Sequence, residues 1–158
     1  MRVTGPTTEA EQATRFEQLY GREHAPMVRV ARLIVGSPGE AEEIVHDAFL
    51  AVHERWDRLD EPGGYLRVCV VNRCRSVLRR RATVERTYVP ADPYMVLPGE
   101  PSLVEAELAK LPARQRIALV LRYYDDRSID DLATALGCRP GAAKSLIHRA
   151  VEQLREVL

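Results

Sequence analysis

Apolar side chains recur at helical spacing along most of the chain, in segments separated by turn residues. The clearest segment is 41–56, where apolar positions step by three or four residues and form one continuous stripe. Its members are Ala41, Ile44, Val45, Ala48, Phe49, Val52 and Trp56. The same spacing predicts a long helix over about 14–35, kinked at Pro26 and ending at the turn residues 36–39. Because no segment alternates as a strand would, the pattern predicts an all-α protein.

A third helix is predicted over about 65–81, after the chain-breaking residues 60–64, with Pro62 suited to its first turn. Its inward positions are Leu66, Val70, Cys74 and Val77. Periodicity then vanishes over 83–101, where four prolines exclude a continuous helix: Pro90, Pro93, Pro98 and Pro101. We interpret this stretch as a linker between two small helical domains. The predicted parts are a disordered arm (1–13), a first domain (14–82), the linker (83–101) and a second domain (102–158).

The second domain contains a short helix, a tight turn and a longer helix. We expect helices at 103–110, 112–124, 128–136 and 140–157, with the inner face of the second formed by Ile117, Val120, Leu121 and Tyr124. Gly137 suits a turn that requires positive φ. This order is typical of a helix-turn-helix, whose second helix enters the major groove of DNA. Its exposed side would offer phosphate and base contacts: Arg139, Lys144, Ser145, His148 and Arg149. An ordinary helical hairpin with a glycine bend is the alternative.

Charge is strongly segregated although the formal net charge is zero. Acidic residues dominate 37–61: Glu40, Glu42, Glu43, Asp47, Glu54, Asp57, Asp60 and Glu61. Arginines dominate 63–86: Arg67, Arg73, Arg75, Arg79, Arg80, Arg81 and Arg86. Folding does not need this separation, because surface charge governs association more than fold. It indicates two docking surfaces of opposite sign, although two solvated helix faces would give the same pattern.

Several function classes lack their usual signals. The three cysteines form no disulfide framework and no CxxC pair, and the histidines have no zinc spacing or catalytic context. The N-terminus has no signal-peptide pattern, and no apolar run reaches membrane length. We therefore expect a cytoplasmic protein without catalytic residues, metal, cofactor or membrane insertion. Trp56 completes the apolar stripe, which favours core packing, but with Tyr65 it is also placed to stack on an unpaired base.

Three stretches together resemble the extracytoplasmic-function sigma factors of the main bacterial sigma family. They are GEAEEIVHDAFLAVHERW (39–56), GYLRVCVVNRCRSVLRRR (64–81) and SIDDLATALGCRPGAAKSLIHRAVEQLREVL (128–158). In that family they correspond to the polymerase-binding helix, the helix for the −10 promoter element and the −35 helix-turn-helix. The resemblance implies a factor that binds core RNA polymerase, recognises both promoter elements and helps to open the promoter. It also implies an anti-sigma factor as a further partner.

The resemblance assigns roles to individual residues. Contacts with the clamp coiled coil of the polymerase's largest subunit fall to Glu43, His46, Asp47 and Leu50. Contacts with the −10 element fall to Gly63, Gly64, Arg67, Asn72, Arg73, Arg75, Arg79 and Arg80, with the two glycines in a loop that captures a flipped base. Contacts with the −35 element fall to Arg122, Arg139, Ala142, Lys144, Ser145, His148 and Arg149. Ala142 and Leu146 depart from the residues common in the family at their positions.

A second interpretation uses only the C-terminal motif. In it, the chain is a helix-turn-helix transcription regulator whose N-terminal domain is unrelated and serves sensing or dimerisation. It leaves the change from acidic to basic residues over 37–86 unexplained. Binding to core polymerase separates the two, because a sigma factor binds the polymerase and hardly binds duplex promoter alone.

Overall fold

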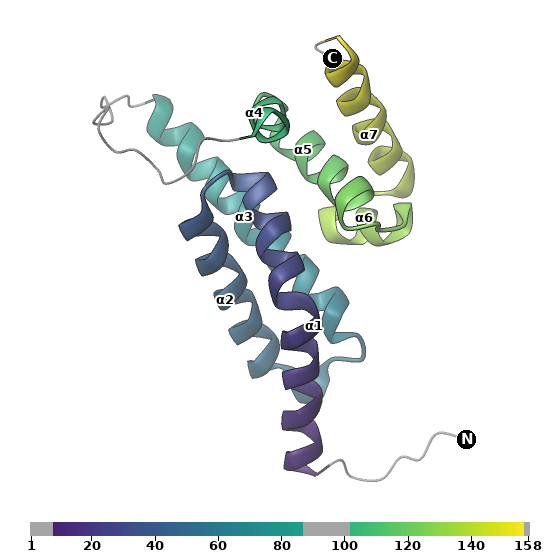
Figure 1. Cartoon of the computed structure of the whole chain (residues 1–158). Helices are drawn as coiled ribbons and strands as arrows, with labels where there is room; N and C mark the ends of the chain where they lie inside the picture. The colour runs from purple at the N-terminus through teal and green to yellow at the C-terminus, as the bar shows by residue number, and fades with distance from the viewer. Residues whose placement is uncertain (1–7, 87–101, 157–158) are drawn as a thin grey trace.

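The chain is built from helices on both sides of residues 87–101. The structure, a computed structural model, describes residues 8–86 (the first half) and 102–156 (the second half). The elements are α1 (Glu9–Val35), α2 (Pro38–Glu54), the 3-10 turn η1 (Trp56–Arg58), α3 (Pro62–Arg86), α4 (Leu103–Ala109), α5 (Ala113–Leu119), the π-helical turn η2 (Val120–Tyr124), α6 (Ile129–Leu136) and α7 (Pro140–Arg155). None of the described residues forms a strand, and the all-α prediction is confirmed (Figure 1).

Helix α1 begins earlier than the sequence pattern predicted. Thr8 caps it and forms a capping box with Glu11, in which each side chain bonds the other residue's backbone N–H. The predicted disordered arm is therefore wrong for residues 9–13, because this capping signal starts the helix before its apolar positions begin. Pro26 lies inside the helix, and Gly36, at φ +79°, ends it in the left-handed conformation that glycine adopts readily.

The first half is a three-helix unit in which α1, α2 and α3 pack against one another. The predicted stripe of α2 is buried from Ala41 to Val52, and Trp56 lies half-buried beyond it against Phe16. Fully burying a Val, Ile or Phe side chain contributes roughly 1.5–3 kcal/mol, so this stripe stabilises the unit strongly. Helix α3 was predicted over about 65–81 but begins at Pro62, the residue that the sequence suited to a first turn, and continues to Arg86, so residues 83–86 are helical. The rest of the predicted linker, 87–101, lies outside the described residues.

The helices of the second half follow the predicted order, with one difference at the π-helical turn η2. Ser102 caps α4 through a capping box with Glu105, and Ser128 caps α6. The N–H of Asp125 bonds the carbonyl of Val120 at 3.1 Å, the π-helical spacing of turn η2. The extra residue in this turn rotates Tyr124 outward, where it is 44% exposed, so its predicted place on the inner face is wrong.

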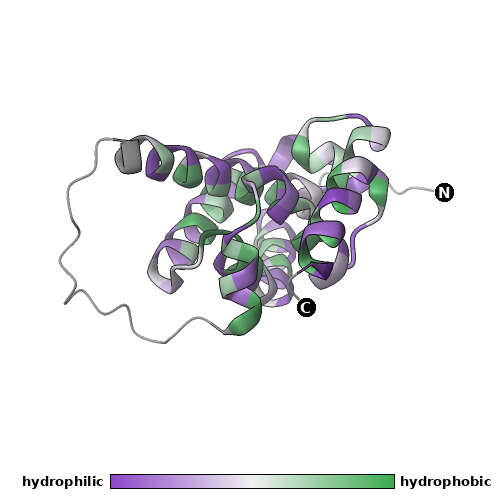
Figure 2. Ribbon diagram, turned by 90° about the horizontal axis from the view of Figure 1, so that it is seen from above, coloured by the Kyte–Doolittle hydropathy of each residue, from purple (hydrophilic) through white to green (hydrophobic). Residues whose placement is uncertain are grey.

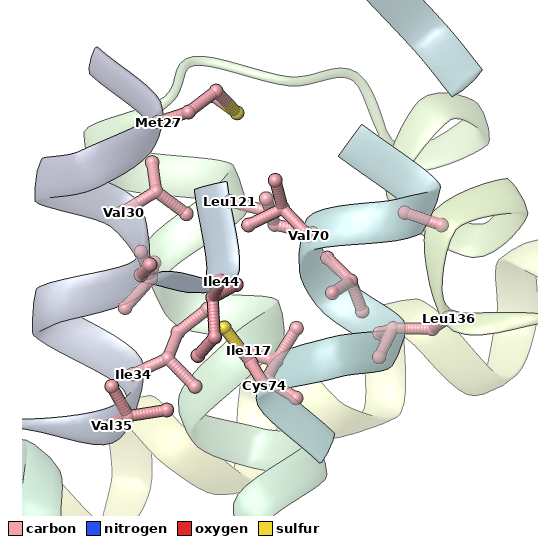
Figure 3. Close-up of a cluster of buried hydrophobic side chains, with 14 of the residues drawn as sticks. Met27, Val30, Ile34, Val35, Ile44, Val70, Cys74, Ile117, Leu121 and Leu136 are labelled. Atoms are coloured by element: carbon pink, nitrogen blue, oxygen red, sulfur yellow. The ribbon is translucent and has the colours of Figure 1, made fainter. Parts of the chain in front are cut away.

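The two halves share one hydrophobic core. Ile117, Leu121 and Leu136 from the second half lie in the same buried cluster as Val70 and Cys74 of α3 (Figure 3). Helix α6 packs against α3, and α4, α5 and η2 all touch α1. Along these helices, green apolar and purple hydrophilic residues recur on the same ribbons, as expected of amphipathic helices that cover one core (Figure 2).

Candidate functional site

The outward face of α2 carries the four residues assigned to polymerase binding. Glu43, His46, Asp47 and Leu50 are all exposed, on the side opposite the buried stripe. Leu50 is 49% exposed, whereas the other large apolar side chains of α2 are buried. The structure thus brings the four residues together as an acidic face with an apolar contact, a composition that suits a basic protein partner.

The basic residues of α3 line a cleft together with that acidic face. The cleft encloses about 900 Å³, and the residues on its two walls are Glu40, Glu43, Ile44, Asp47, Arg73, Ser76, Val77, Arg80 and Arg81. Glu40 and Arg81 form an ion pair across it. The two surfaces that the sequence presented as separate are therefore adjacent, because packing of α2 on α3 places the acidic wall opposite the basic wall.

A hydrogen bond from Arg73 of α3 to the backbone of α2 joins the two walls of the cleft. The Nη2 of Arg73 donates to the backbone carbonyl of Asp47 at 3.3 Å, while its Nε is buried without a hydrogen-bond partner. Asn72 is exposed at the neighbouring position, and Arg79 and Arg80 are exposed about two turns further along α3. Asn72, Arg79 and Arg80 are thus accessible to a ligand, whereas Arg73 is partly engaged within the protein.

Arg67 is not on this open surface. Its Nε lies 2.9 Å from Oδ2 of Asp125 and its Nη2 lies 3.4 Å from Oε2 of Glu23. Only 11% of the Arg67 side chain and 7% of the Asp125 side chain are exposed. A residue assigned to the −10 element is therefore occupied by a carboxylate from the second half of the chain.

Gly63 and Gly64 lie in the first turn of α3, not in the loop where the sequence placed them. That expectation is wrong because Pro62 starts the helix before the glycines. A cavity of about 410 Å³ nevertheless lies beside Gly63, lined on the other side by Trp56 and by residues of α1 such as Arg15 and Arg22. Sequence reasoning missed the α1 residues, since nothing in their spacing marks them as neighbours of 56–63.

The helix-turn-helix has the expected local geometry. Gly137, at φ +65°, ends α6 in the left-handed conformation, and Ala133 and Ala143 are buried where α6 and α7 cross. Helix α7 buries Ala143 and Ala150 and exposes residues on the opposite side. Exposed residues assigned to the −35 element are Arg139, Ala142, Lys144, Ser145, His148 and Arg149.

Two members of the −35 set differ from the rest. Ser145 donates its hydroxyl to the carbonyl of Gly141 at 3.1 Å, so one of its bonding directions is already used. Arg122 belongs to turn η2 and not to α7, and its Nη1 donates to the carbonyl of Arg127 at 3.0 Å. The exposed row on α7 is therefore the main candidate surface of the second half.

An apolar groove of about 360 Å³ opens between α1, α4, η2 and α7, and sequence reasoning missed it. Most of the strongly exposed large apolar side chains gather there: Leu103, Val104, Tyr123 and Tyr124. Exposed apolar patches of this kind mark sites of protein contact. The sequence offered no signal for it, because these positions continue ordinary helical patterns.

Arg116 is a further residue that the sequence did not single out. Its guanidinium donates to the carbonyls of Ile34, Ala109 and Leu111, at 2.7, 2.9 and 2.9 Å. Burial first, and then the charge of Arg81, lowers the pKa of Arg116. This arginine joins the end of α1 to the second half, so it serves the packing of the two halves.

Among residues 8–86 and 102–156, no cluster of His, Cys, Asp or Glu is arranged to hold a metal ion. Within the same ranges, no helix combines the length and apolar character needed to cross a membrane. Burial raises the pKa of the Cys74 thiol to about 12, and burial likewise raises that of Cys69. Both thiols therefore stay protonated at neutral pH, which disfavours nucleophilic chemistry at these cysteines.

Comparisons with known proteins identify both halves. Residues 19–84 match sigma-70 region 2, and residues 102–154 match sigma-70 region 4. The chain is 33% identical to the ECF RNA polymerase sigma factor SigM of Mycobacterium tuberculosis, over 90% of this chain and 76% of the relative. It is 28% identical to the RNA polymerase sigma-E factor of Streptomyces coelicolor, over 93% of this chain and 88% of the relative.

Solved structures share the fold. The sigma factor RpoE of Bartonella quintana, crystallised with the anti-sigma factor NepR, matches with a TM-score of 0.73 at 23% identity, over 90% of this chain and 96% of that one. CnrH, in complex with the cytosolic domain of CnrY, matches with a TM-score of 0.70 at 22% identity, over 94% of this chain and 92% of that one.

Proposed function

This chain belongs to the ECF sigma factors of RNA polymerase, and we propose which of its residues carry each step of promoter recognition. As an alternative sigma factor it has core polymerase and promoter DNA as partners. Sigma factors are non-catalytic initiation factors, and we extend this to the present chain, which needs no cofactor. We place its action in the cytoplasm, where polymerase and promoter are found.

We assign polymerase binding to the exposed face of α2. Glu43, His46 and Asp47 supply charge and hydrogen bonds, and Leu50 supplies apolar area that a partner would bury. The observation that carries the proposal is the exposure of these four residues on one face, next to the basic wall of α3.

We assign the −10 element to α3 and to the cavity beside its first turn. Asn72 supplies an amide for base edges, while Arg73, Arg75, Arg79 and Arg80 supply phosphate contacts. The 410 Å³ cavity beside Gly63 and Trp56 is large enough for a base taken out of the stack. Strand opening then needs no catalytic group, because binding the unpaired strand offsets the cost of unstacking.

We assign the −35 element to the exposed row of α7. Arg139, Lys144 and Arg149 provide positive charge for phosphates, while Ser145 and His148 provide hydrogen bonds for base edges. The alternative of a regulator with an unrelated N-terminal domain is wrong, because residues 19–84 match sigma-70 region 2.

An anti-sigma factor is a further proposed partner. The two similar structures carry such a protein or a companion domain in their complexes. The apolar groove between α1, α4, η2 and α7 and the acidic face of α2 are the surfaces of this chain with the composition of a protein contact.

The test of the proposal is run-off transcription with purified bacterial core polymerase on genomic fragments, combined with a binding assay for the polymerase. We expect Asn72→Ala to reduce promoter opening at least tenfold, followed by permanganate reactivity of unpaired thymines, and to leave polymerase affinity within twofold. Thr14→Ala, an exposed polar-to-alanine change on α1, serves as the control and should leave both readouts unchanged. Equal loss of both readouts in Asn72→Ala, or loss of neither, would refute the base-reading role.

A further inference from the structure

The cavity beside Gly63 is lined by charges of opposite sign from different elements. Arg15 and Arg22 line it from α1, whereas Asp57 and Asp60 line it from the segment between α2 and α3. A nucleotide has the complementary arrangement, because its phosphate is an anion and the edge of its base can offer N–H donors to a carboxylate. The cavity therefore suits a nucleotide in one orientation, with its phosphates toward α1 and its base toward the two aspartates.

The two arginines lie on one face of α1. Arg15 and Arg22 are seven residues apart, nearly two helical turns, so their side chains project in similar directions about 10 Å apart along the axis. Arg15 is exposed and forms no ion pair with any residue that the structure describes. The Nε of Arg22 lies 3.5 Å from Oε1 of Glu23, the next residue, and 68% of the Arg22 side chain is exposed. Because exposed ion pairs of this kind contribute little, both guanidiniums are available to bind separate anions.

Helix α1 continues past the start of α3. Leu19 of α1 lies beside Gly63, where a Cβ added to the glycine would be 3.8 Å from the Cδ1 of Leu19. Near the other end of α3, Arg81 donates to the carbonyl of Val35, the last residue of α1, so the two helices run side by side in the same direction. Arg15 is one turn before Leu19, and in Figure 1 the first turns of α1 project beyond the start of α3. A strand bound along the basic row of α3 would therefore pass the cavity and then meet the first turns of α1.

The cavity also contains an aromatic side chain suited to a base. Trp56 lines it together with Arg15 and Arg22, and its indole is half-buried. Aromatic rings stack on all four bases, so this contact needs no particular sequence. The cavity thus combines cations for phosphates, a ring for the base and acceptors for the base edge.

We propose that α1 is a further DNA-binding element of this chain: Arg15 and Arg22 bind phosphates of the unpaired strand around the nucleotide whose base enters the cavity. This inference rests on the proposed capture of an unpaired base beside Gly63 and Trp56. The arginines hold the backbone of the strand at α1, and the base then points toward Asp57 and the neighbouring loop. The reverse orientation is disfavoured, because it would place the phosphates against carboxylates.

The test uses the full chain bound to core polymerase and each single strand of a promoter found by run-off transcription. The strands carry a fluorophore and are about 20 nucleotides long, which exceeds a typical single-strand binding site. Arg15→Gln and Arg22→Gln each remove one charge at an exposed position, where substitutions leave folding intact. Arg29→Gln is the matched control, because Arg29 is an exposed arginine of the same helix, seven residues beyond Arg22 and outside the cavity lining.

We expect Arg15→Gln and Arg22→Gln each to weaken binding of the tighter-binding strand about tenfold. Each lost phosphate contact should also make the slope of log affinity against log salt shallower by about 0.7. Arg29→Gln should stay within about twofold of wild type with an unchanged slope. All three variants should bind core polymerase within about twofold of wild type, since none of them changes the face of α2.

A second measurement identifies the contact itself. A methylphosphonate replaces one phosphate of the strand at a time, which removes the charge and keeps the shape. If Arg15 binds a given phosphate, the replacement there weakens binding by the wild type about tenfold and leaves binding by Arg15→Gln nearly unchanged. Arg22→Gln should show the same pattern at a different phosphate, because the two side chains are about 10 Å apart.

Each outcome decides the inference. It is overturned if the losses from the methylphosphonate and from the arginine variants multiply independently at every phosphate, or if Arg29→Gln weakens binding as much as Arg15→Gln. If Asn72→Ala weakens binding of the same strand while Arg15→Gln and Arg22→Gln do not, this inference fails and the proposed role of α3 stands. If none of these variants changes binding, Asn72→Ala included, the proposed role of α3 fails as well.

Discussion

Replacing Leu136 by alanine tests whether the two halves unfold as one unit. Leu136 ends α6, is 1% exposed and belongs to the buried cluster that includes Val70 and Cys74 of α3 (Figure 3). The change removes three carbon atoms from the region where α6 packs on α3. If the shared core is one cooperative unit, the substitution must lower the unfolding stability of the first half as well as that of the second.

The expected cost follows from burial. A fully buried Leu→Ala change costs about 2–5 kcal/mol, the sum of lost transfer free energy and the cavity that remains. We take about 3 kcal/mol, because α6 is a short surface helix that can partly collapse into the space. With a urea m-value of about 2 kcal/mol/M, the midpoint of unfolding should fall by about 1.5 M. The melting temperature should fall by about 6–12 °C, at 2–4 °C per kcal/mol.

The chain provides its own local probe for the assay. Trp56 is the only tryptophan, and it packs on Phe16 within the first half at 5.5 Å between ring centroids. Its fluorescence therefore reports the first half, while far-UV circular dichroism reports helices of both halves. We expect both signals to shift together in Leu136→Ala. Leu103→Ala, the same change at a residue 71% exposed, is the control and should shift stability by less than about 0.5 kcal/mol.

A different result would refute the shared core. If Leu136→Ala shows an early loss of helix by circular dichroism while the Trp56 transition stays at its wild-type midpoint, the halves unfold independently. The packing of the two halves against each other would then depend on the ion pairs and hydrogen bonds between them, without cooperative apolar packing.

Three other predictions concern surfaces and thiols. Asp47→Arg should weaken polymerase binding at least tenfold with unchanged melting temperature, because it inverts charge on an exposed face. Glu17→Arg, the same charge inversion at an exposed position of α1, is the control and should bind polymerase normally. Wild-type affinity in Asp47→Arg would contradict the α2 assignment. Lys144→Ala should weaken −35 duplex binding and make the slope of log affinity against log salt shallower by about one unit, whereas an unchanged slope would exclude a phosphate contact. At pH 8 the Cys74 thiol, whose pKa burial raises to about 12, should react with a thiol reagent far more slowly in the folded than in the urea-unfolded protein; equal rates would contradict its burial.

Local patterns in the sequence predicted the helices well. The stripe of α2, the cap at Ser102 and the left-handed turn at Gly137 all depend on residues within about one helical turn. The start of α1 was misplaced because the capping box at Thr8 precedes the first apolar position. The orientation of Tyr124 was misplaced because a single π-helical turn changes the phase of everything after it.

The functional site could be predicted only where it is continuous along one helix. The exposed faces of α2 and α7 follow from the same periodicity that buries their other sides. The pairing of Arg67 with Asp125 joins residues 58 positions apart, and the bond from Arg116 to Ile34 joins residues 82 positions apart. No spacing rule connects such residues, because their proximity depends on how the two halves pack.

The adjacency of the two walls of the α2–α3 cleft makes polymerase binding and DNA binding energetically linked. Glu43 and Asp47 line the same cleft as Arg73 and Arg80. The guanidinium of Arg73 reaches the backbone carbonyl of Asp47 at 3.3 Å, a separation well within the screening length of about 8 Å at physiological salt. These carboxylates attract the arginines and repel DNA phosphates. A basic partner that neutralises Glu43 and Asp47 removes both effects, so it raises the affinity of the arginines for DNA. Because the coupling between two binding sites is reciprocal, DNA bound to the basic wall raises the affinity of that partner for the acidic wall. A sigma factor with this arrangement favours the promoter when it is bound to polymerase.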